Sequence, residues 1–351
     1  MDFTFDEQQI AFRDAIRKFL MVEAAPEALA EIWETKSGRS QELRAKLADQ
    51  GLTALSVPED YGGIGLGDLD WVLIQQELGY YAIPDSLSDT AYLAVHLLKN
   101  QPPNGGFAGE WLRKVASGKV RIAIGHPANP LVADAEAADL LLLHYQDEIH
   151  ALKPGEVKLT ANPSIDRSRR LYQVDWKPTA ATRICAPSTG RVLWDGIANR
   201  AALATAAQLL GLAQRMLDLG IDYSAQRKQF GKPVGSFQAV KHHLADVAVK
   251  IEFARPVVFR AAYALARNDA RVATLVSHAK LAAGDAATLA ARRSLQVHGA
   301  LGYTWETDLQ MFMKRAWALD AAWGDRGWHK TRICAHIFAD ASPVGPGTTF
   351  S

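Results

Sequence analysis

Cysteine, excess charge and long apolar runs are all scarce in this chain of 351 residues. Its two cysteines, Cys185 and Cys334, lie far apart in the sequence, which indicates a reducing compartment and excludes the close spacing of zinc or redox motifs. The formal net charge is +1, so we expect neither a basic nucleic-acid surface nor an acidic tail. No window approaches the roughly 20 apolar residues that a membrane span needs.

The first residues also lack the character of a secretory signal peptide. Asp6, Glu7 and Asp14 interrupt the apolar residues of MDFTFDEQQIAFRDAIRKFL. We therefore expect a cytoplasmic protein. The composition is that of an ordinary globular protein, 48% hydrophobic and 22% charged, and the length suggests two or three domains.

Two outer regions follow a helical period. In residues 1–118 an amphipathic first helix carries the apolar stripe Ile10, Phe12, Ile16, Phe19 and Leu20, and further helices are expected near 42–50 and 69–78. Residues 196–340 predict a four-helix bundle, because apolar residues recur by threes and fours from Val240 to Val258. The polar, Gly- and Pro-rich residues 341–351 predict a mobile tail.

The middle region, residues 119–195, has the texture of strands and turns. Short apolar runs at 120–124, 140–143, 157–159, 171–176 and 191–194 are separated by Pro, Asn, Asp and Gly. Several short strands predict a small barrel or sandwich. The predicted fold class is thus mainly α with a small β domain: an N-terminal helical domain, a shortened β-barrel-like middle domain and a C-terminal four-helix bundle.

Three segments resemble the motifs of a known family. They are LADQGLTALSVPEDYGG at 47–63 with QQELG at 75–79, YSAQRKQFGKPVGSFQAVKHHLADVAVKIEFAR at 223–255, and LQVHGALGYTWETDLQMFMKR at 295–315. Together with the domain order they resemble the acyl-CoA dehydrogenase family over nearly the whole chain. The resemblance implies a flavoprotein oxidoreductase of lipid metabolism, in which FAD desaturates an acyl-CoA between its α and β carbons and passes electrons to an electron-transfer flavoprotein.

The segment similar to QRKQFGKPVGSFQ implies half of a cofactor site. In that family it binds the ADP half of an FAD that a neighbouring subunit mainly holds, and a guanidinium such as Arg227 can meet a diphosphate with two parallel hydrogen bonds. A lone Arg at a helix end is otherwise a solvated charge or surface ion pair. The cofactor-binding residues that the resemblance implies are Arg227, Gln229, Phe230, Val234, Gln238, Gln296, Val297, Gly299 and Ala300.

The catalytic base of the family is not found at its expected positions. A carboxylate must take the weakly acidic proton beside the thioester carbonyl while hydride leaves for the flavin. Its two known positions correspond to Trp323 and Ala201, and neither side chain accepts a proton. Asp325 is a weak candidate near the first position.

Two further family features are also missing. The stretch AIGHPANPLVADAE at 123–136 keeps Pro127 but lacks the hydroxyl and the Gly-Ser-Asp of the flavin-ring loop. In ANRAALA at 198–204, Asn199 and Ala202 replace the Asp and Arg that hold CoA, and Arg200 is a nearby candidate for a weak substitute.

Three losses beside an intact ADP half-site predict a non-catalytic subunit. The chain resembles that subunit of the heteromeric α2β2 acyl-CoA dehydrogenases of bacterial steroid side-chain degradation, with FAD shared across a subunit interface. A catalytic partner subunit would bind most of the acyl-CoA and, through the complex, reach the electron-transfer flavoprotein. The alternatives are a self-sufficient FAD enzyme with a relocated base and a flavin-free structural or binding protein on the same fold.

Other side chains are interpreted as ordinary features. His242 and His243 are expected to be surface or interface residues, and no third ligand at metal spacing accompanies them. Trp323, Trp328 and His329 are expected to pack the end of the bundle or, alternatively, to plug the vacated active site. RSRR at 167–170 is expected to be an exposed charge cluster, too short for a nucleic-acid site.

Overall fold

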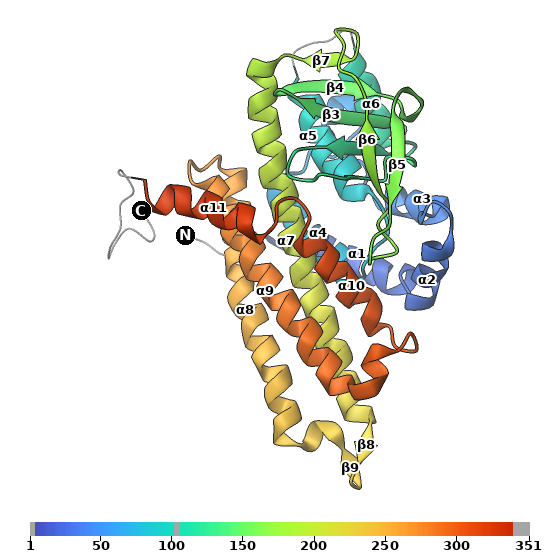
Figure 1. Cartoon of the computed structure of the whole chain (residues 1–351), viewed down its shortest axis with the longest axis vertical. Coiled ribbons are helices and arrows are strands. Elements are labelled where there is room, and N and C mark those ends of the chain that lie inside the picture. Colours follow the sequence, from blue (N-terminus) through green and yellow to red (C-terminus); the bar gives the residue numbers. More distant parts are fainter. Residues whose placement is uncertain (1–3, 102–105, 340–351) are drawn as a thin grey trace.

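The computed structural model describes residues 4–101 and 106–339, so the tail predicted at 341–351 lies outside the described residues. Helices dominate, and two small sheets lie at one end of the molecule beside the N-terminal helical region, while a long helical bundle extends to the opposite end (Figure 1). The predicted class, mainly α with a small β domain, is confirmed. No described helix is long and apolar enough to cross a membrane. The described residues also hold no group of three or more His, Cys, Asp or Glu able to bind a metal.

The N-terminal region begins with a capped amphipathic helix. Asp6 accepts a hydrogen bond from the Gln9 backbone while the Gln9 side chain accepts one from the Asp6 backbone, which satisfies two free amides of the first turn. Ile16 and Leu20 are buried, whereas Ile10 lies outside the core. The helices are α1 (Glu7–Glu23), α2 (Pro26–Glu34), α3 (Gln41–Asp49), α4 (Asp68–Tyr80), the π-helix Ser88–Ala94, α5 (Val95–Lys99) and α6 (Phe107–Ala116).

The middle region forms two small sheets that share a core. One has the order β1-β3-β4-β7, in which β1 and β3 are parallel, and the other has the order β2-β6-β5. Leu141 and Leu143 of β3 pack toward Val132 and Tyr172 of the second sheet. The strands are β1 (Ile122–Gly125), β2 (Val132–Ala133), β3 (Leu140–Tyr145), β4 (Glu148–Leu152), β5 (Lys158–Asn162), β6 (Leu171–Asp175) and β7 (Arg183–Cys185).

The strand predicted at 191–194 is wrong. These residues belong to α7 (Pro187–Gln226), which starts with Pro187 at its first position, where the missing amide costs nothing. Leu193, Trp194 and Ile197 are buried together because they recur at helical spacing. Four residues are too few to distinguish the period of a strand from that of a helix, so the flanking residues decide which element forms here.

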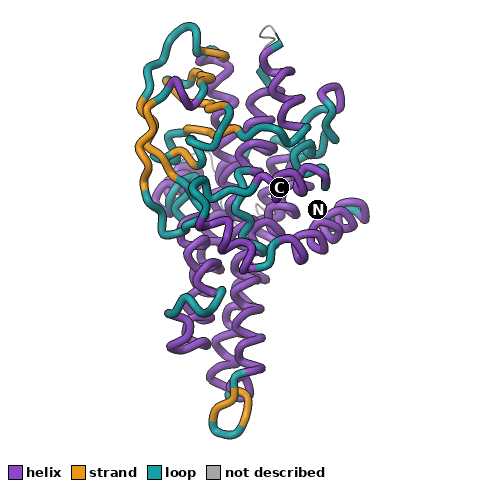
Figure 2. The backbone as a smooth tube through the Cα atoms, turned by 90° about the vertical axis from the view of Figure 1, so that its right-hand side faces the viewer, coloured by secondary structure: helices purple, strands orange, loops and turns teal. Residues whose placement is uncertain are grey.

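The bundle is built around α7, whose middle is buried nearly all round. Helices α8 (Gln238–Ala266) and α9 (Val272–His298) run alongside it. Helix α10 (Leu309–Asp320) packs against both α7 and α9, and α11 (Arg326–Ile337) packs against α9. Between α7 and α8 the chain makes the hairpin of β8 (Lys228–Gln229) and β9 (Lys232–Pro233). Figure 2 shows this hairpin at the tip of the bundle, far from the sheets.

Two glycines allow the N-terminal region to pack closely on the bundle. A Cβ added to Gly79 of α4 would collide with the Gln208 backbone, and one on Gly211 of α7 would collide with the Gln76 backbone. The backbones of α4 and α7 therefore touch at this crossing. Gln208, which lies at this contact, also lines the cavity described below.

Candidate functional site

The tip of the bundle presents one aromatic side chain directly to solvent. Arg227 ends α7, and the two-residue turn of the following hairpin is Phe230-Gly231, with φ of +52° and +79°. Positive φ at both positions is typical of a type I′ turn, which favours Asn and Gly and is unfavourable for Phe. Phe230 is nevertheless 91% exposed, so little packing within the chain compensates for its backbone strain.

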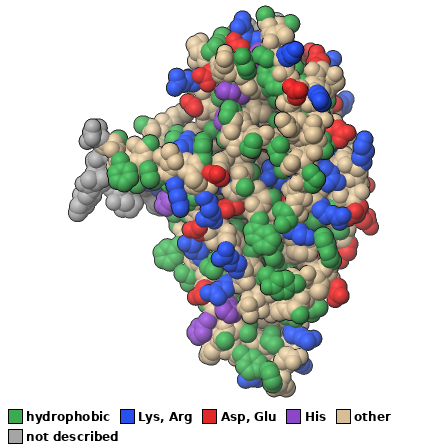
Figure 3. Space-filling model, in the orientation of Figure 1, with side chains coloured by type: hydrophobic (Ala, Val, Ile, Leu, Met, Phe, Trp, Pro, Cys, Tyr) green, Lys and Arg blue, Asp and Glu red, His purple; other side chains and the backbone are tan. Residues whose placement is uncertain are grey.

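A groove of about 480 Å³ lies beside this hairpin, between the ends of α7, α8 and α9. Phe230 and Gln238 of the predicted set lie outside its lining, Phe230 on the hairpin and Gln238 as the first residue of α8. The structure brings together the other predicted cofactor-binding residues along it, namely Arg227, Gln229, Val234, Gln296, Val297, Gly299 and Ala300. In Figure 3 this lower end of the molecule shows hydrophobic, basic and His side chains.

The chemistry of the groove suits an anion with a flat ring. Its cation is Arg227, and α8 starts beside it at Gln238 with no side-chain cap, which leaves the positive end of the helix facing outward. Tyr223 and His298 stack with ring centroids 4.3 Å apart. Gly299 has φ +60° and ψ −137°, a conformation that only glycine adopts readily, and so exposes backbone to the groove.

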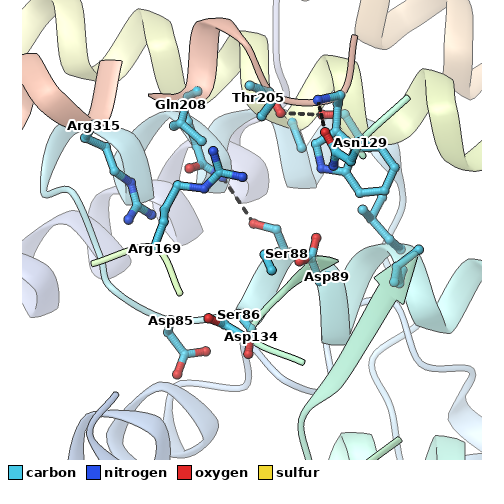
Figure 4. Close-up of a pocket in the computed structure, with 18 of the residues that line it drawn as sticks. Asp85, Ser86, Ser88, Asp89, Asn129, Asp134, Arg169, Thr205, Gln208 and Arg315 are labelled. Atoms are coloured by element: carbon cyan, nitrogen blue, oxygen red, sulfur yellow. Dashed lines mark hydrogen bonds between the residues drawn. The ribbon is translucent and has the colours of Figure 1, made fainter. Parts of the chain in front are cut away.

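The two positions expected for a catalytic base meet in a different place. Ala201 of α7 and Trp323 of the α10–α11 loop line one cavity between α7, β1 and the π-helix. Figure 4 shows this cavity with its polar lining residues labelled. The cavity measures about 80 Å³, whereas pockets for cofactors and drug-sized ligands usually measure about 300–1,000 Å³. Trp323 is only 7% exposed and forms part of the cavity wall.

Loop contacts from both sides hold Trp323 in place. Its backbone N–H donates to Asn129 Oδ1 at 2.6 Å, and the next N–H, of Gly324, donates to Ala128 O at 3.2 Å. Its carbonyl accepts from His329 Nε2 at 3.2 Å. Burial lowers the pKa of His329 to about 3, so this imidazole is neutral and its proton sits on Nε2. Trp323 and His329 are both buried, as the predicted packing role requires. Trp323 also lines the cavity at the base positions, as the alternative prediction of a plug requires.

A cluster of aromatic rings lies beside Trp323, on the side that faces the sheets. The His126 ring lies between Trp194 and Trp323, with centroids at 5.6 Å and 5.8 Å, and His144 lies 5.4 Å from Trp194. Burial lowers the pKa of His126 to about 4, so it is neutral and packs as an aromatic side chain. Residues 126–129, expected to be a degenerate flavin loop, therefore contact the chain's own Trp323.

Polar side chains from distant segments line the rest of the cavity. Burial, with a smaller contribution from Asp134, raises the pKa of Asp89 to about 7. Gln208 donates to Ser88 Oγ at 3.2 Å, as the dashed line in Figure 4 shows. Arg169 lines the cavity and donates to Ala318 O at 3.0 Å. The exposed cluster predicted at 167–170 is therefore wrong for Arg169 and for the fully buried Ser168, since both face inward.

Comparison with known proteins decides the family. The sequence model of the acyl-CoA dehydrogenase N-terminal domain matches residues 6–119, and that of the C-terminal domain matches residues 192–338. The chain is 30% identical over 339 residues to the acyl-CoA dehydrogenase IpdE2 of Mycolicibacterium smegmatis, covering 95% of this chain and 99% of that protein. The chain belongs to the acyl-CoA dehydrogenase family.

Solved acyl-CoA dehydrogenases share the fold. The ChsE4-ChsE5 complex from Mycobacterium tuberculosis superposes with a TM-score of 0.84 at 22% identity, covering 98% of this chain and all of the matched chain. The Tcur3481-Tcur3483 steroid ACAD superposes with a TM-score of 0.81 at 20% identity, covering 93% and 96%. These similarities extend over the N-terminal helices, the sheets and the bundle together.

Three residues at or near the expected catalytic and CoA-binding positions have structural partners here. Asp325 caps α11, since its Oδ1 accepts from the Trp328 backbone at 2.7 Å. Asn199 accepts from Arg332 at 2.5 Å inside the fold. Arg200, the candidate substitute for the CoA-holding Arg, binds both oxygens of Asp68 at 3.0 Å and 2.9 Å.

Sequence reasoning missed several residues of both sites. Asp89, Asn129 and Arg169 lie in three separate segments that only the fold brings together, and no motif connects them. His243 lines the groove, although it was interpreted with His242 as a surface or interface residue. The helical periodicity of α8 could have separated these two histidines, because it places His243 on the face of Ala239 and Val240.

Proposed function

We propose that this chain is the non-catalytic subunit of a heteromeric, FAD-dependent acyl-CoA dehydrogenase. It supplies the ADP half of an FAD site to a catalytic partner and performs no chemistry at its own base positions. The observation that carries the proposal is a contrast: the groove at the bundle tip is open, at about 480 Å³, whereas the cavity at the base positions is about 80 Å³.

The groove fits the ADP half of FAD. A diphosphate needs cationic and amide donors, which Arg227, the start of α8 and the backbone at Gly299 offer. The groove lies at the surface, so a cofactor bound there remains open to a second subunit. Phe230 extends outward from the same hairpin and is available to contact the nucleotide or the partner.

The ring half of FAD does not fit at the base positions of this chain. Trp323, His126 and Trp194 occupy the space, and the loop at 126–129 is bound to the Trp323 loop. Ala201 cannot accept a proton, and Asp325 already caps α11. When bound, FAD supplies the hydride acceptor for desaturation, and we assign that step, most of the acyl-CoA contacts and the reaction with an electron-transfer flavoprotein to the partner subunit.

The relatives support a heteromer that acts on bulky acyl groups. One matched structure is a ChsE4-ChsE5 complex, and another is a steroid ACAD made of two named proteins. We extend both properties to this chain, as an α2β2 complex with FAD at each interface between unlike subunits, in the degradation of steroids.

The test is the FAD content of the complex. The chain is tagged in its native host, purified with the acyl-CoA dehydrogenase subunit that accompanies it, and compared with an Arg227→Ala variant. We expect about two FADs per α2β2 complex for the wild type, and loss of most of this FAD in the variant. Lys228→Ala is the matched control, because Lys228 is exposed in the same hairpin but does not line the groove.

Two results would contradict the proposal. A chain that is yellow by itself, carries one FAD per chain and desaturates an acyl-CoA is a self-sufficient dehydrogenase. A complex that forms but stays colourless indicates a structural or binding protein without flavin.

A further inference from the structure

The structure separates two neighbouring histidines that look alike in the sequence. His243 is half-buried and lines the groove with Ala239 and Val240, which precede it by one turn of α8. His242 is exposed and is not part of the lining. Adjacent residues on a helix point about 100° apart, so only one of the pair can face a ligand in the groove.

The charges that line the groove leave a diphosphate incompletely matched. The ADP half of FAD carries two negative charges at its diphosphate. Among the described residues that line the groove, Arg227 is the one with a permanent positive charge, and none is acidic. His298 donates from Nδ1 to Ser294 O at 2.7 Å, and burial lowers the pKa of its imidazole, so His298 stays neutral.

We propose that His243 is the second phosphate-binding side chain of this half-site, opposite Arg227. Arg227 approaches from the end of α7, whereas His243 approaches from the first turns of α8. An imidazole offers an N–H donor in either charge state and adds a positive charge when protonated. The two side chains would clamp the diphosphate from two different helices. This inference rests on the proposed function, since the ligand is FAD.

The test measures FAD dissociation from the purified complex by fluorescence after dilution. Losing a hydrogen bond to a charged group should increase the dissociation constant about 10- to 100-fold in His243→Ala. His243→Lys restores a cation on a flexible stem and should return the constant to within about threefold of wild type. His242→Ala is the matched control and should behave as wild type. Because His243 is half-exposed, all variants should keep the wild-type circular dichroism.

The results separate this inference from the proposed function. If the wild-type complex binds no FAD, the proposed function fails and this inference fails with it. If the wild type binds FAD and Arg227→Ala loses it, but His243→Ala and His242→Ala are indistinguishable, the inference alone is wrong. It is also wrong if His243→Phe retains FAD better than His243→Lys, because the ring would then act by stacking rather than by charge.

Discussion

The groove at the C-terminal end of α7 and the cavity nearer its N-terminal end differ in size and in burial. At its C-terminal end the groove is open, bears an exposed Phe230 in a strained turn and a cation at Arg227, and contributes little to the core. Nearer its N-terminal end, Ala201 and Trp323 close a cavity with side chains of the chain itself. One region leaves an aromatic side chain exposed beside a groove, and the other is closed by buried side chains.

That difference agrees with our proposal, which expects a ligand in the open groove and none in the closed cavity. Backbone strain alone does not distinguish the regions, because Trp323 has a φ of +55°, close to the +52° of Phe230. The regions differ in burial, since Phe230 is 91% exposed and Trp323 is buried. Side chains that fill an empty site stabilise the fold, because an unfilled cavity destabilises it in proportion to its volume. Substitutions in the two regions should therefore separate stability from FAD binding.

The largest expected effect is on the filled side. Trp323→Ala should lower the free energy of unfolding by about 3–5 kcal/mol, because it removes a buried indole and leaves its space empty. Urea denaturation of the isolated chain measures this loss. The FAD content of any folded complex should not change, since Trp323 lies in a different site from the groove.

Two controls sharpen the Trp323 experiment. Trp305 is 66% exposed, so Trp305→Ala should cost less than about 1 kcal/mol. Added indole should raise the Tm of Trp323→Ala but not that of the wild type, because it can refill the cavity. Equal losses in the two variants would show that Trp323 is not what fills the site.

A smaller effect concerns the acid left in the cavity. Burial raises the pKa of Asp89 to about 7 in the folded protein, far above the ordinary value near 3.8. The folded state thus holds a proton that the unfolded state releases between these pH values. The stability that Asp89 contributes is complete below about pH 4 and is lost as pH rises through about 7.

Asp89→Asn should remove this pH dependence. At pH 8 the variant should be more stable than wild type by about 1–3 kcal/mol, within the roughly 4 kcal/mol that a shift of about three pKa units allows. At pH 5 the two should differ much less, because Asp89 is then protonated. Urea titrations at both pH values measure the difference, with the exposed Asp60→Asn as the control for charge. A gain of the same size at both pH values would contradict the buried-acid interpretation.

The sequence predicted the structural elements where apolar residues repeat strongly. Runs at 120–124, 140–143 and 171–176 became β1, β3 and β6, because hydrophobic residues there face a core on at least one side. The strands β4 and β7 were missed because their few apolar residues alternate with polar ones and form no continuous apolar run. The run at 191–194 was misassigned because four residues do not distinguish a strand from a helix, and the flanking residues place it inside α7.

The two candidate sites differ in how much of their lining could be predicted from the sequence. The groove is formed by short segments at 223–243 and 296–301, so local motifs predicted most of its lining. The cavity joins Asp89, Asn129, Arg169 and Gln208 from four separate segments, and its burial follows from the position of the Trp323 loop. A motif can indicate that no carboxylate stands at the expected base positions, whereas only the packing shows which side chains lie around them.

The smallest expected effect on stability is in the open region, and it is stabilising, opposite to the effect of Trp323→Ala. Phe230→Asn places Asn-Gly in the type I′ turn, which this backbone favours, so the free energy of unfolding should rise by about 0.5–1 kcal/mol. The same variant should weaken FAD binding by the complex. Gly231→Ala is the matched control: it keeps the ring but strains the φ of +79°, so it should destabilise the chain. If Phe230→Asn is destabilising and keeps its FAD, the ring packs within the chain, and the contrast between the two regions disappears.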